Sequence, residues 1–422
     1  MAYRRVSLIA AGLLVFATTL ALHLRLGAPW ALVAAAALAT PPLFARYGAE
    51  SRPYMSWLLL FALTLMAGAE AASRPWRETG RARRAALAVS AVALSLVALP
   101  GALQAALAGL LCALSWRRRV QDRGESRAAL RWSLLLAAAC VAVGLYFGAR
   151  SPCRAYDAGY LAFRWPDRTG RMASVLALLW GDGIAGQIGN ALSALGLVAA
   201  LRLPAPRGLD EESARPAAFA SWLARGLAAQ LALTVVLAVQ VALLGYYFID
   251  RVFLHLVICR ALLVAVGGWW LMRWLEARGG PPTRTALQAL ASGLAVFAVA
   301  TAFVTLRTRA EDARSALPAG NEVPCAALGG TLVLDRPADT RDWAAGPNLI
   351  VRLAEDRRRC GADPSRDTRH VLATGDAGYR ISAGRAPGAI PLEQCGREVI
   401  LSWGALAARP PDPPLASSAA PK

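Results

Sequence analysis

Charged residues are scarce in this chain, at 17%, whereas hydrophobic residues make up 56%. Ordinary globular domains hold about 25% charged and about 45–50% apolar residues, so this composition is typical of a membrane protein. Long apolar runs alternate with short Arg-rich segments as far as Leu306, and no later run is long enough to span a bilayer. We therefore expect a transmembrane domain at 1–306, a water-soluble domain at 307–408 and a disordered tail at 409–422.

Acidic residues are also few, with 27 Asp and Glu against 46 Lys and Arg, which gives a net charge of +19. Residues 307–422 hold 16 basic and 14 acidic residues, which leaves 30 and 13 for residues 1–306. The positive excess thus lies between the apolar runs, where cytoplasmic loops of membrane proteins carry it. This location indicates membrane lipid as the partner and argues against nucleic acid.

Metal-binding and catalytic patterns are missing. The chain has only three histidines, one of them (His370) in the soluble part, and no paired C-x-x-C spacing, so we expect neither zinc nor another cofactor. Asp335, Asp339 and Asp342 alternate with arginines, which favours a solvated, salt-bridged turn over an acid–base site. The catalytic residues stay unknown, and the sequence leaves open whether the protein is an enzyme.

Apolar runs of the length that crosses a bilayer, about 20 residues, recur along the first domain. The run Ala85–Trp116 is interrupted by Pro100-Gly101 and has arginines on both flanks, which favours a hairpin with both ends in the cytoplasm. Together the runs predict a polytopic α-helical membrane protein of about nine to eleven transmembrane helices. The other expected spans are Val6–Leu22, Ala28–Phe44, Met55–Ala72, Trp132–Phe147, Met172–Leu201, Leu223–Tyr247, Val252–Leu275 and Leu287–Leu306.

Loop charge predicts the orientation in a cytoplasmic (inner) membrane. The short basic segment 117–131 is expected inside, so segment 151–171 lies outside and the last span delivers the C-terminal domain outside. Counting back through a hairpin at 85–116 also places the N-terminus outside, which conflicts with Arg4 and Arg5.

Seven cysteines divide into two groups along the chain. Cys112, Cys140 and Cys259 fall within apolar runs, where a thiol behaves as a small hydrophobe. The other four fall in segments that loop charge places outside, where disulfides persist. We therefore expect disulfides, with the pairing left open, among Cys153, Cys325, Cys360 and Cys395.

Short β-rich runs separated by turn residues characterise the soluble segment, which predicts a small extracytoplasmic β-rich or α+β domain. The runs are Thr331–Leu334, Asn348–Arg352, His370–Leu372, Tyr379–Ile381 and Glu398–Ser402.

Polar residues interrupt the apolar stretch 172–201, where Asp182 and Asn190 are the strongest candidates for an intramembrane site. The spacing Gly181-x-Gly183-x-x-Gly186 matches a dinucleotide fingerprint, but that motif needs a soluble strand–turn–helix unit. Over a short stretch the segment resembles the glycine–aspartate–alanine–glycine element of polyprenol and phytol kinases and related membrane cytidylyltransferases, without the basic residues expected after it.

Two further interpretations of this stretch stay open. A broken or re-entrant helix could bind an ion through its exposed backbone, as in transporters. Alternatively, Gly181, Ala185 and Gly189 recur every four residues and form a small-residue face on which a neighbouring helix packs closely.

A second candidate lies in the run that begins at Val252. Arg260 stands deep in this run, and Asp182 is taken as the one carboxylate clearly within a span, so we predict an Asp182–Arg260 interaction with His255 above it, in an outward-facing polar cleft. The alternative is that Arg260 satisfies backbone carbonyls or reaches a lipid phosphate.

Aromatic and cationic residues gather in segments expected at the outer face, where guanidinium groups bind phosphate and aromatic rings stack on sugars. We therefore expect a protein that handles a lipid-linked or cell-envelope substrate there. The alternatives are a transporter or channel with a midplane polar site, and a non-catalytic sensor or assembly subunit with an envelope protein as its partner. The candidate contacts with a lipid or lipid-linked glycan are Arg154, Tyr156, Arg164, Trp165, Arg168, Asp250 and Arg251.

Overall fold

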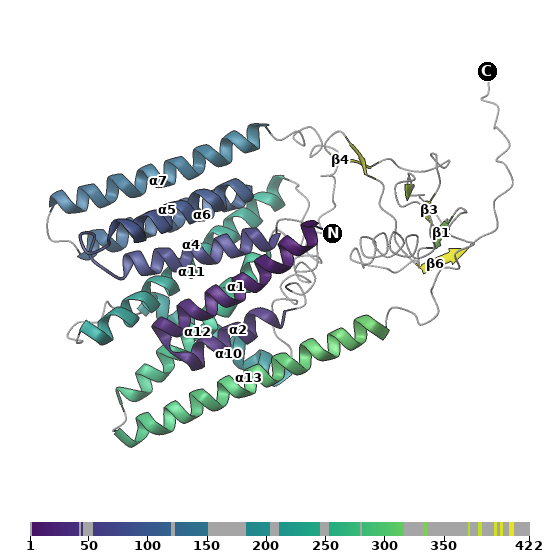
Figure 1. The fold of residues 1–422 in the computed structure, drawn as a ribbon. Coiled ribbons are helices and arrows are strands. Elements are labelled where there is room, and N and C mark those ends of the chain that lie inside the picture. The colour runs from purple at the N-terminus through teal and green to yellow at the C-terminus, as the bar shows by residue number, and fades with distance from the viewer. Residues whose placement is uncertain are drawn as a thin grey trace. The chain divides into compact units, whose positions relative to one another are not determined.

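The chain divides into two units, Met1–Thr308 and Arg309–Lys422, in a computed structural model. The structure describes residues 2–41, 44, 54–119, 123–150, 183–202, 211–244, 253–278 and 281–315, together with six short strands. Within these ranges the first unit is helical, as Figure 1 shows.

Helices of the first unit lie roughly side by side (Figure 1). They are α1 (Ala2–Leu26), α2 (Ala28–Ala39), α4 (Tyr54–Ala72), α5 (Arg81–Val97), α6 (Leu99–Arg119), α7 (Arg123–Arg150), α10 (Gly183–Arg202), α11 (Glu211–Leu244), α12 (His255–Glu276) and α13 (Pro281–Ser315), the last of which continues into the second unit.

Six of the described helices contain a stretch long and apolar enough to cross a membrane, namely Val6–Leu26, Tyr54–Ala72, Arg123–Tyr146, Ala214–Val239, His255–Glu276 and Thr283–Thr308. Ala28–Ala39 and Ile184–Ala199 are apolar but shorter. This is the construction of a multi-pass helical membrane protein. The larger count of about nine to eleven spans stays a prediction.

Two short breaks reverse the chain between packed helices. Gly27, with a φ of 94°, separates α1 from α2 in a backbone conformation that favours glycine. Ala98 is extended between α5 and α6, and a Cβ on Gly101 would lie 2.5 Å from Leu94 O. The interrupted run 85–116 therefore folds as two helices packed together, in agreement with the hairpin interpretation.

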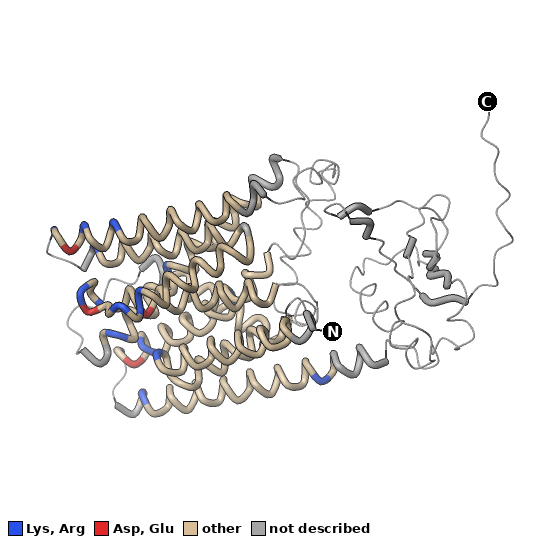
Figure 2. Tube along the Cα trace, turned by 45° about the horizontal axis from the view of Figure 1, so that its top comes forward, with Lys and Arg blue, Asp and Glu red and all other residues tan. Residues whose placement is uncertain are grey.

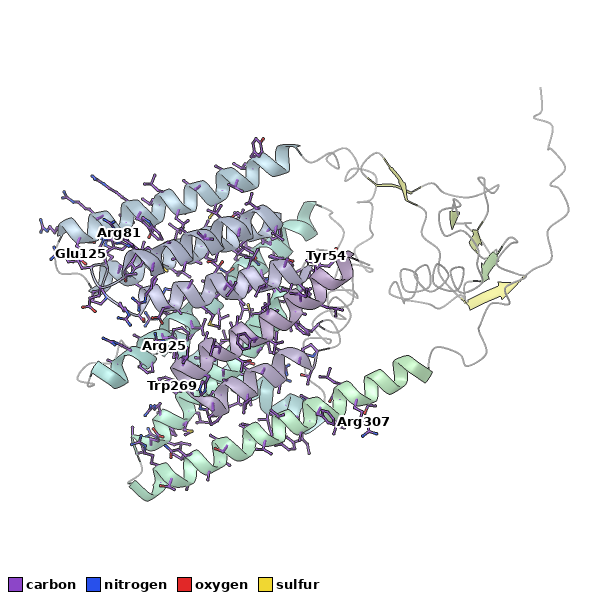
Figure 3. All side chains as sticks on the ribbon, in the orientation of Figure 1. Arg25, Tyr54, Arg81, Glu125, Trp269 and Arg307 are labelled. Atoms are coloured by element: carbon purple, nitrogen blue, oxygen red, sulfur yellow. The ribbon has the colours of Figure 1, made fainter. Side chains whose placement is uncertain are left out.

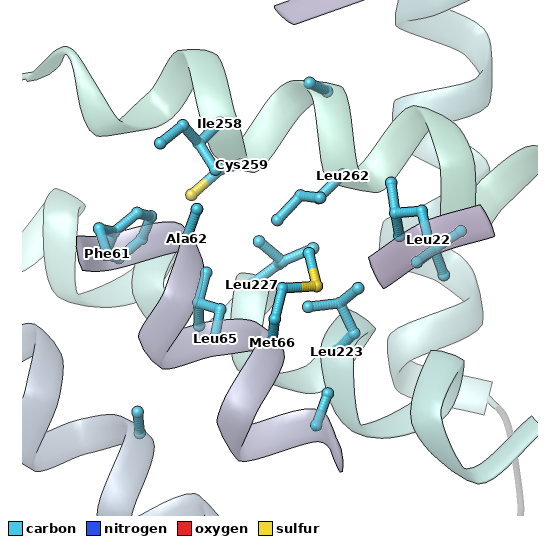
Figure 4. Close-up of a cluster of buried hydrophobic side chains, with 14 of the residues drawn as sticks. Leu22, Phe61, Ala62, Leu65, Met66, Leu223, Leu227, Ile258, Cys259 and Leu262 are labelled. Atoms are coloured by element: carbon cyan, nitrogen blue, oxygen red, sulfur yellow. The ribbon is translucent and has the colours of Figure 1, made fainter. Parts of the chain in front are cut away.

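The apolar core is built around α12, which packs against α2, α4, α10 and α11. Figure 4 shows Phe61 and Leu65 of α4, Leu227 of α11 and Leu262 of α12 together in one such cluster. In an 18-residue apolar window of α12, 72% of the residues are buried, against 17% in the corresponding window of α13. A helix that is apolar on all sides suits the centre of a bundle, whereas α13 keeps large apolar side chains exposed, as a lipid-facing helix does.

Helices α10 and α12 approach each other most closely at glycines. A Cβ on Gly196 would lie 2.5 Å from Leu263 O, and one on Gly267 would overlap Leu192 O and lie 2.7 Å from Gly196 N. Small residues permit such contacts in membrane proteins, where van der Waals packing contributes much of the helix association energy.

Charged residues gather at one end of the helices (Figure 2). Arg81 and Glu125 lie at this end, hereafter the charged end, whereas Tyr54 and Arg307 lie at the opposite end (Figure 3). Because α13 runs away from the charged end, the chain leaves the first unit at the opposite end.

The second unit contains short strands β1 (Leu332–Asp335), β2 (His370–Val371), β3 (Tyr379–Ile381), β4 (Leu392–Gln394), β5 (Arg397–Val399) and β6 (Ala405–Ala408). Their pairing is antiparallel, in the order β2-β3-β1-β6, with β4 and β5 forming a separate pair. The expected β-rich or α+β class and the disordered tail at 409–422 stay predictions, and the expected run Asn348–Arg352 lies outside the described residues.

Replacing Gly267 by alanine is expected to separate α10 from α12, because the added methyl group overlaps Leu192 O. Overpacking of this kind costs about 1–3 kcal/mol, so the thermal unfolding midpoint in detergent should fall. Gly293→Ala on α13 is the matched control, since a Cβ there meets nothing within 4 Å. Equal midpoints for the two variants would contradict the close contact.

Candidate functional site

Arg260 of α12 lies against the first turns of α10 and is only partly exposed. Its Nη2 donates to Asn190 Oδ1 at 3.1 Å and to Gly186 O at 3.4 Å, while its Nε donates to Asn190 Oδ1 at 3.3 Å. The two candidate residues Asn190 and Arg260 are thus brought together. The bond to Gly186 O matches the alternative in which Arg260 satisfies a backbone carbonyl.

Small residues of α10 leave room for this guanidinium. A Cβ on Gly189 would lie 3.1 Å from Arg260 Nη2, and the Ser193 hydroxyl donates to Arg260 O at 3.4 Å as well as to Gly189 O at 2.9 Å. Ala185 lies one turn before Gly189 and is partly exposed. The glycine thus lets a long cationic side chain lie along the helix.

The acceptors of Arg260 are neutral. Among the described residues, no carboxylate lies within ion-pair distance of it. Asp182, its predicted partner, and Gly181 lie outside the described residues, so the Asp182–Arg260 interaction stays a prediction. The described contacts therefore solvate the guanidinium but leave its charge uncompensated.

His255 points to another side of α12. Its Nε2 lies 2.7 Å from Thr234 Oγ1 on α11, and its ring contacts Trp57 and Phe61 of α4, with ring centroids 5.6 Å apart in both cases. It is 3% exposed. Residues five positions apart on an α-helix are about 140° apart around its axis, so His255 and Arg260 face different neighbours.

A buried polar network extends from His255 across four helices. Thr234 donates to Gln230 O at 2.7 Å, Gln230 Nε2 donates to Gln104 O at 3.0 Å, and Trp57 Nε1 donates to Gln104 Oε1 at 3.0 Å. Within the described part of the chain, this network does not meet Arg260. The predicted position of His255 above Arg260 in one cleft is therefore corrected, because the two side chains belong to separate polar groups.

Sequence reasoning missed this network and a third polar group. Gln104 stands within the apolar run 85–116, and Glu70 stands near the end of the expected span 55–72, so both carried the signal of a polar residue in an apolar run. Taking Asp182 as the one carboxylate clearly within a span was wrong, because Glu70 lies inside Tyr54–Ala72 and binds arginines.

Several other candidates lie outside the described residues. Among the cysteines, Cys112, Cys140 and Cys259 are buried and not disulfide-bonded. The expected disulfides and outer-face contacts stay predictions. The residues concerned are Cys153, Cys325, Cys360 and Cys395, and Arg154, Tyr156, Arg164, Trp165, Arg168, Asp250 and Arg251.

Arg260→Ala and Asn190→Ala should each destabilise the protein, and their effects should not add, because each change removes the same hydrogen bonds. Polar contacts between membrane helices give coupling energies of about 0.6 kcal/mol on average and up to about 1.7 kcal/mol. A double-mutant cycle on unfolding in mixed micelles measures the coupling.

The matched cycle uses Arg273 and Glu276, an exposed pair on the same helix with a 3.0 Å contact. Exposed pairs of this kind couple weakly. If the effects of Arg260→Ala and Asn190→Ala add fully, the result would contradict a hydrogen-bonded contact between the two side chains.

Comparison with known proteins gives no relative: no protein-family description, no curated protein and no solved structure matches the chain.

Proposed function

We propose that the protein handles an anionic substrate, lipid-linked or part of the cell envelope, at the outer face of the cytoplasmic membrane. The observation that carries this proposal is Arg260, a cation within an apolar helix whose described hydrogen-bond acceptors are neutral. Ionisable groups at membrane depth are costly and usually mark substrate or ion sites. A phosphate group on the substrate would supply the negative charge that balances the Arg260 guanidinium, which the neutral acceptors Asn190 Oδ1 and Gly186 O do not supply.

Orientation of the helices supports an outer location for this site. Arginines gather at the charged end, and cytoplasmic segments are enriched in basic residues, so the charged end is assigned to the cytoplasm. Helix α12 ends next to the start of α13, at the charged end (Figure 1), and Arg260 lies only about 7.5 Å along the axis from the first residue of α12, His255. The guanidinium then lies in the outer half of the bilayer, within reach of a substrate headgroup.

Sequence neighbours of the site fit the same substrate. Segment 151–171, with Arg154 and Trp165 among its residues, precedes α10 in the chain, while Asp250 and Arg251 precede α12. Arginine forks bind phosphate and aromatic rings stack on sugars. On this proposal Asp182, four positions before Gly186 in the sequence, holds Arg260 when the substrate is absent.

Native mass spectrometry of the purified protein tests this proposal. We expect a co-purified phosphate-bearing lipid or glycolipid that is retained by the wild type and by Arg273→Gln, and lost from Arg260→Gln. The control lies in the last turn of the same helix, and its side chain is 48% exposed. Equal retention by all three proteins would overturn the proposal and favour a sensor or assembly subunit.

A transporter is the second candidate, because the network of Trp57, Gln104, Gln230, Thr234 and His255 places polar groups of four helices inside the bundle. On this alternative, Thr234→Val should abolish uptake of the substrate into proteoliposomes that contain the protein. The variant should still retain the molecule bound at Arg260. Loss of the bound molecule with the same substitution would contradict two separate sites.

The proposed orientation predicts which positions react with a membrane-impermeant maleimide. In a background that lacks the four candidate disulfide cysteines, Arg307→Cys should be labelled from outside in intact cells, because α13 ends away from the charged end. Arg127→Cys, exposed near the start of α7, should be labelled only after the membrane is permeabilised. The reverse pattern would invert the assignment of the two faces.

A further inference from the structure

Three arginines from separate segments contact one carboxylate at the charged end, and a fourth acts on one of the three. Arg25 Nη2 at the end of α1 lies 2.6 Å from both carboxylate oxygens of Glu70 on α4. Arg83 Nε on α5 lies 3.3 Å from Glu70 Oε1, and Arg74 Nε, in the turn between α4 and α5, lies 3.8 Å from the same oxygen. Arg215 of α11 is close enough to repel Arg74. We name these five residues the Glu70 cluster.

Three guanidinium groups of the Glu70 cluster, those of Arg25, Arg74 and Arg83, lie against one carboxylate, so positive charge exceeds negative charge at these contacts. Burial lowers the pKa of Arg74 from its ordinary value, and repulsion by Arg83 and Arg215 lowers it further, while Glu70 raises it. Arg74 Nε is also buried without a hydrogen-bond acceptor among the described residues, although its side chain is 18% exposed. Arg25, Arg74 and Arg83 therefore crowd one another around a single carboxylate.

Loop charge alone does not require this convergence. Basic residues that orient a membrane protein act through their number near the spans, so they need not meet at one point. Exposed arginines of α12 and the following turn show the ordinary arrangement, since Arg273 pairs with Glu276 and Arg278 lies over Trp274. The Glu70 cluster instead brings together segments up to 190 positions apart in the chain, from Arg25 to Arg215.

Aromatic residues beside the cluster indicate its depth. Trp76, Trp116 and Trp132 pack together, with ring centroids 4.8, 5.8 and 5.9 Å apart, and Arg84 lies 4.3 Å over the ring of Trp76. Tryptophan gathers at membrane interfaces, where the phosphates of lipid headgroups also lie. A phosphate at this level would be within reach of guanidinium forks.

We propose that the Glu70 cluster is a binding site for a phosphate-bearing anion, either the headgroup of an anionic phospholipid or a soluble phosphate ester. Guanidinium groups donate paired hydrogen bonds to phosphate oxygens, and Glu70 keeps the arginines in place when the anion is absent. The site lies at the end of the bundle opposite to Arg260 and is independent of the proposed substrate site. Basic pockets between helices on the cytoplasmic side bind anionic headgroups in this way.

Two probes distinguish the sources of the phosphate. The full-length protein is placed in phosphatidylcholine nanodiscs, and its thermal unfolding midpoint is measured with cardiolipin in the disc and, separately, with inorganic pyrophosphate in solution. A rise with cardiolipin alone assigns the site to a lipid headgroup, and a rise with pyrophosphate assigns it to a soluble phosphate. No rise with either probe overturns the proposal.

Substitutions locate the effect. Arg74→Gln combined with Arg83→Gln should weaken binding of the effective probe by about tenfold or more, because charge-assisted hydrogen bonds are lost. Arg273→Gln, an arginine at the same end outside the cluster, should bind as the wild type does. Arg260→Gln should also keep this binding, so failure of the substrate proposal is distinguishable from failure of this one.

Glu70→Gln keeps the proposal testable if the double variant does not fold. Without the carboxylate, the arginines repel one another more strongly, so the unfolding midpoint should fall in phosphatidylcholine alone and the anion should raise it by more than in the wild type. A shift of the same size in wild type, Glu70→Gln and Arg273→Gln would show that the anion acts through general surface charge. That result would overturn the site.

Discussion

Contact between α10 and α12 without intervening side chains is the constraint on which the candidate site depends. Gly196 and Gly267 allow the two backbones to meet, and this closeness brings Asn190 and the Gly186 carbonyl within hydrogen-bond distance of Arg260. A side chain at either glycine would push the helices apart and leave a guanidinium among apolar groups without acceptors. Since isolated charges at membrane depth are costly, the packing of the two helices and the presence of Arg260 are coupled.

Central placement of α12 explains why its polar residues serve different neighbours. A helix that is buried on nearly all sides presents each polar side chain to a different helix, since successive residues turn about 100° around the axis. His255 therefore meets Thr234 of α11 and the rings of α4, while Arg260 meets α10. Each group finds hydrogen-bond partners on its own side of α12, which limits the cost of burying polar atoms in an apolar bundle.

Sequence alone predicted the features that depend on composition and local breaks. Apolar runs identified the membrane class, and Pro100-Gly101 marked the break within 85–116, since both signals are local and strong. It also singled out Asn190 and Arg260, because polar residues are conspicuous in apolar runs. The partners were harder to predict: which side of α12 faces α4, α10 or α11 depends on three-dimensional packing, and a uniformly apolar helix carries no amphipathic pattern that would indicate it.

Glu70 is a second case in which the sequence shows a polar residue but does not predict its partners. In sequence it is one acidic residue near the end of an apolar run, and the arginines around it look like ordinary basic flanks of four separate segments. Arg74 follows Glu70 by four positions, but only the fold brings Arg25 and Arg83 to the same carboxylate. Both Arg260 and the Glu70 cluster thus have more positive charge than their described partners neutralise, at opposite ends of the bundle. The free-energy cost of an unpaired cation rises with its depth in the membrane, so an anion stabilises Arg260 more than it stabilises the Glu70 cluster. The Glu70 cluster lies closer to water and can exchange its anion more readily.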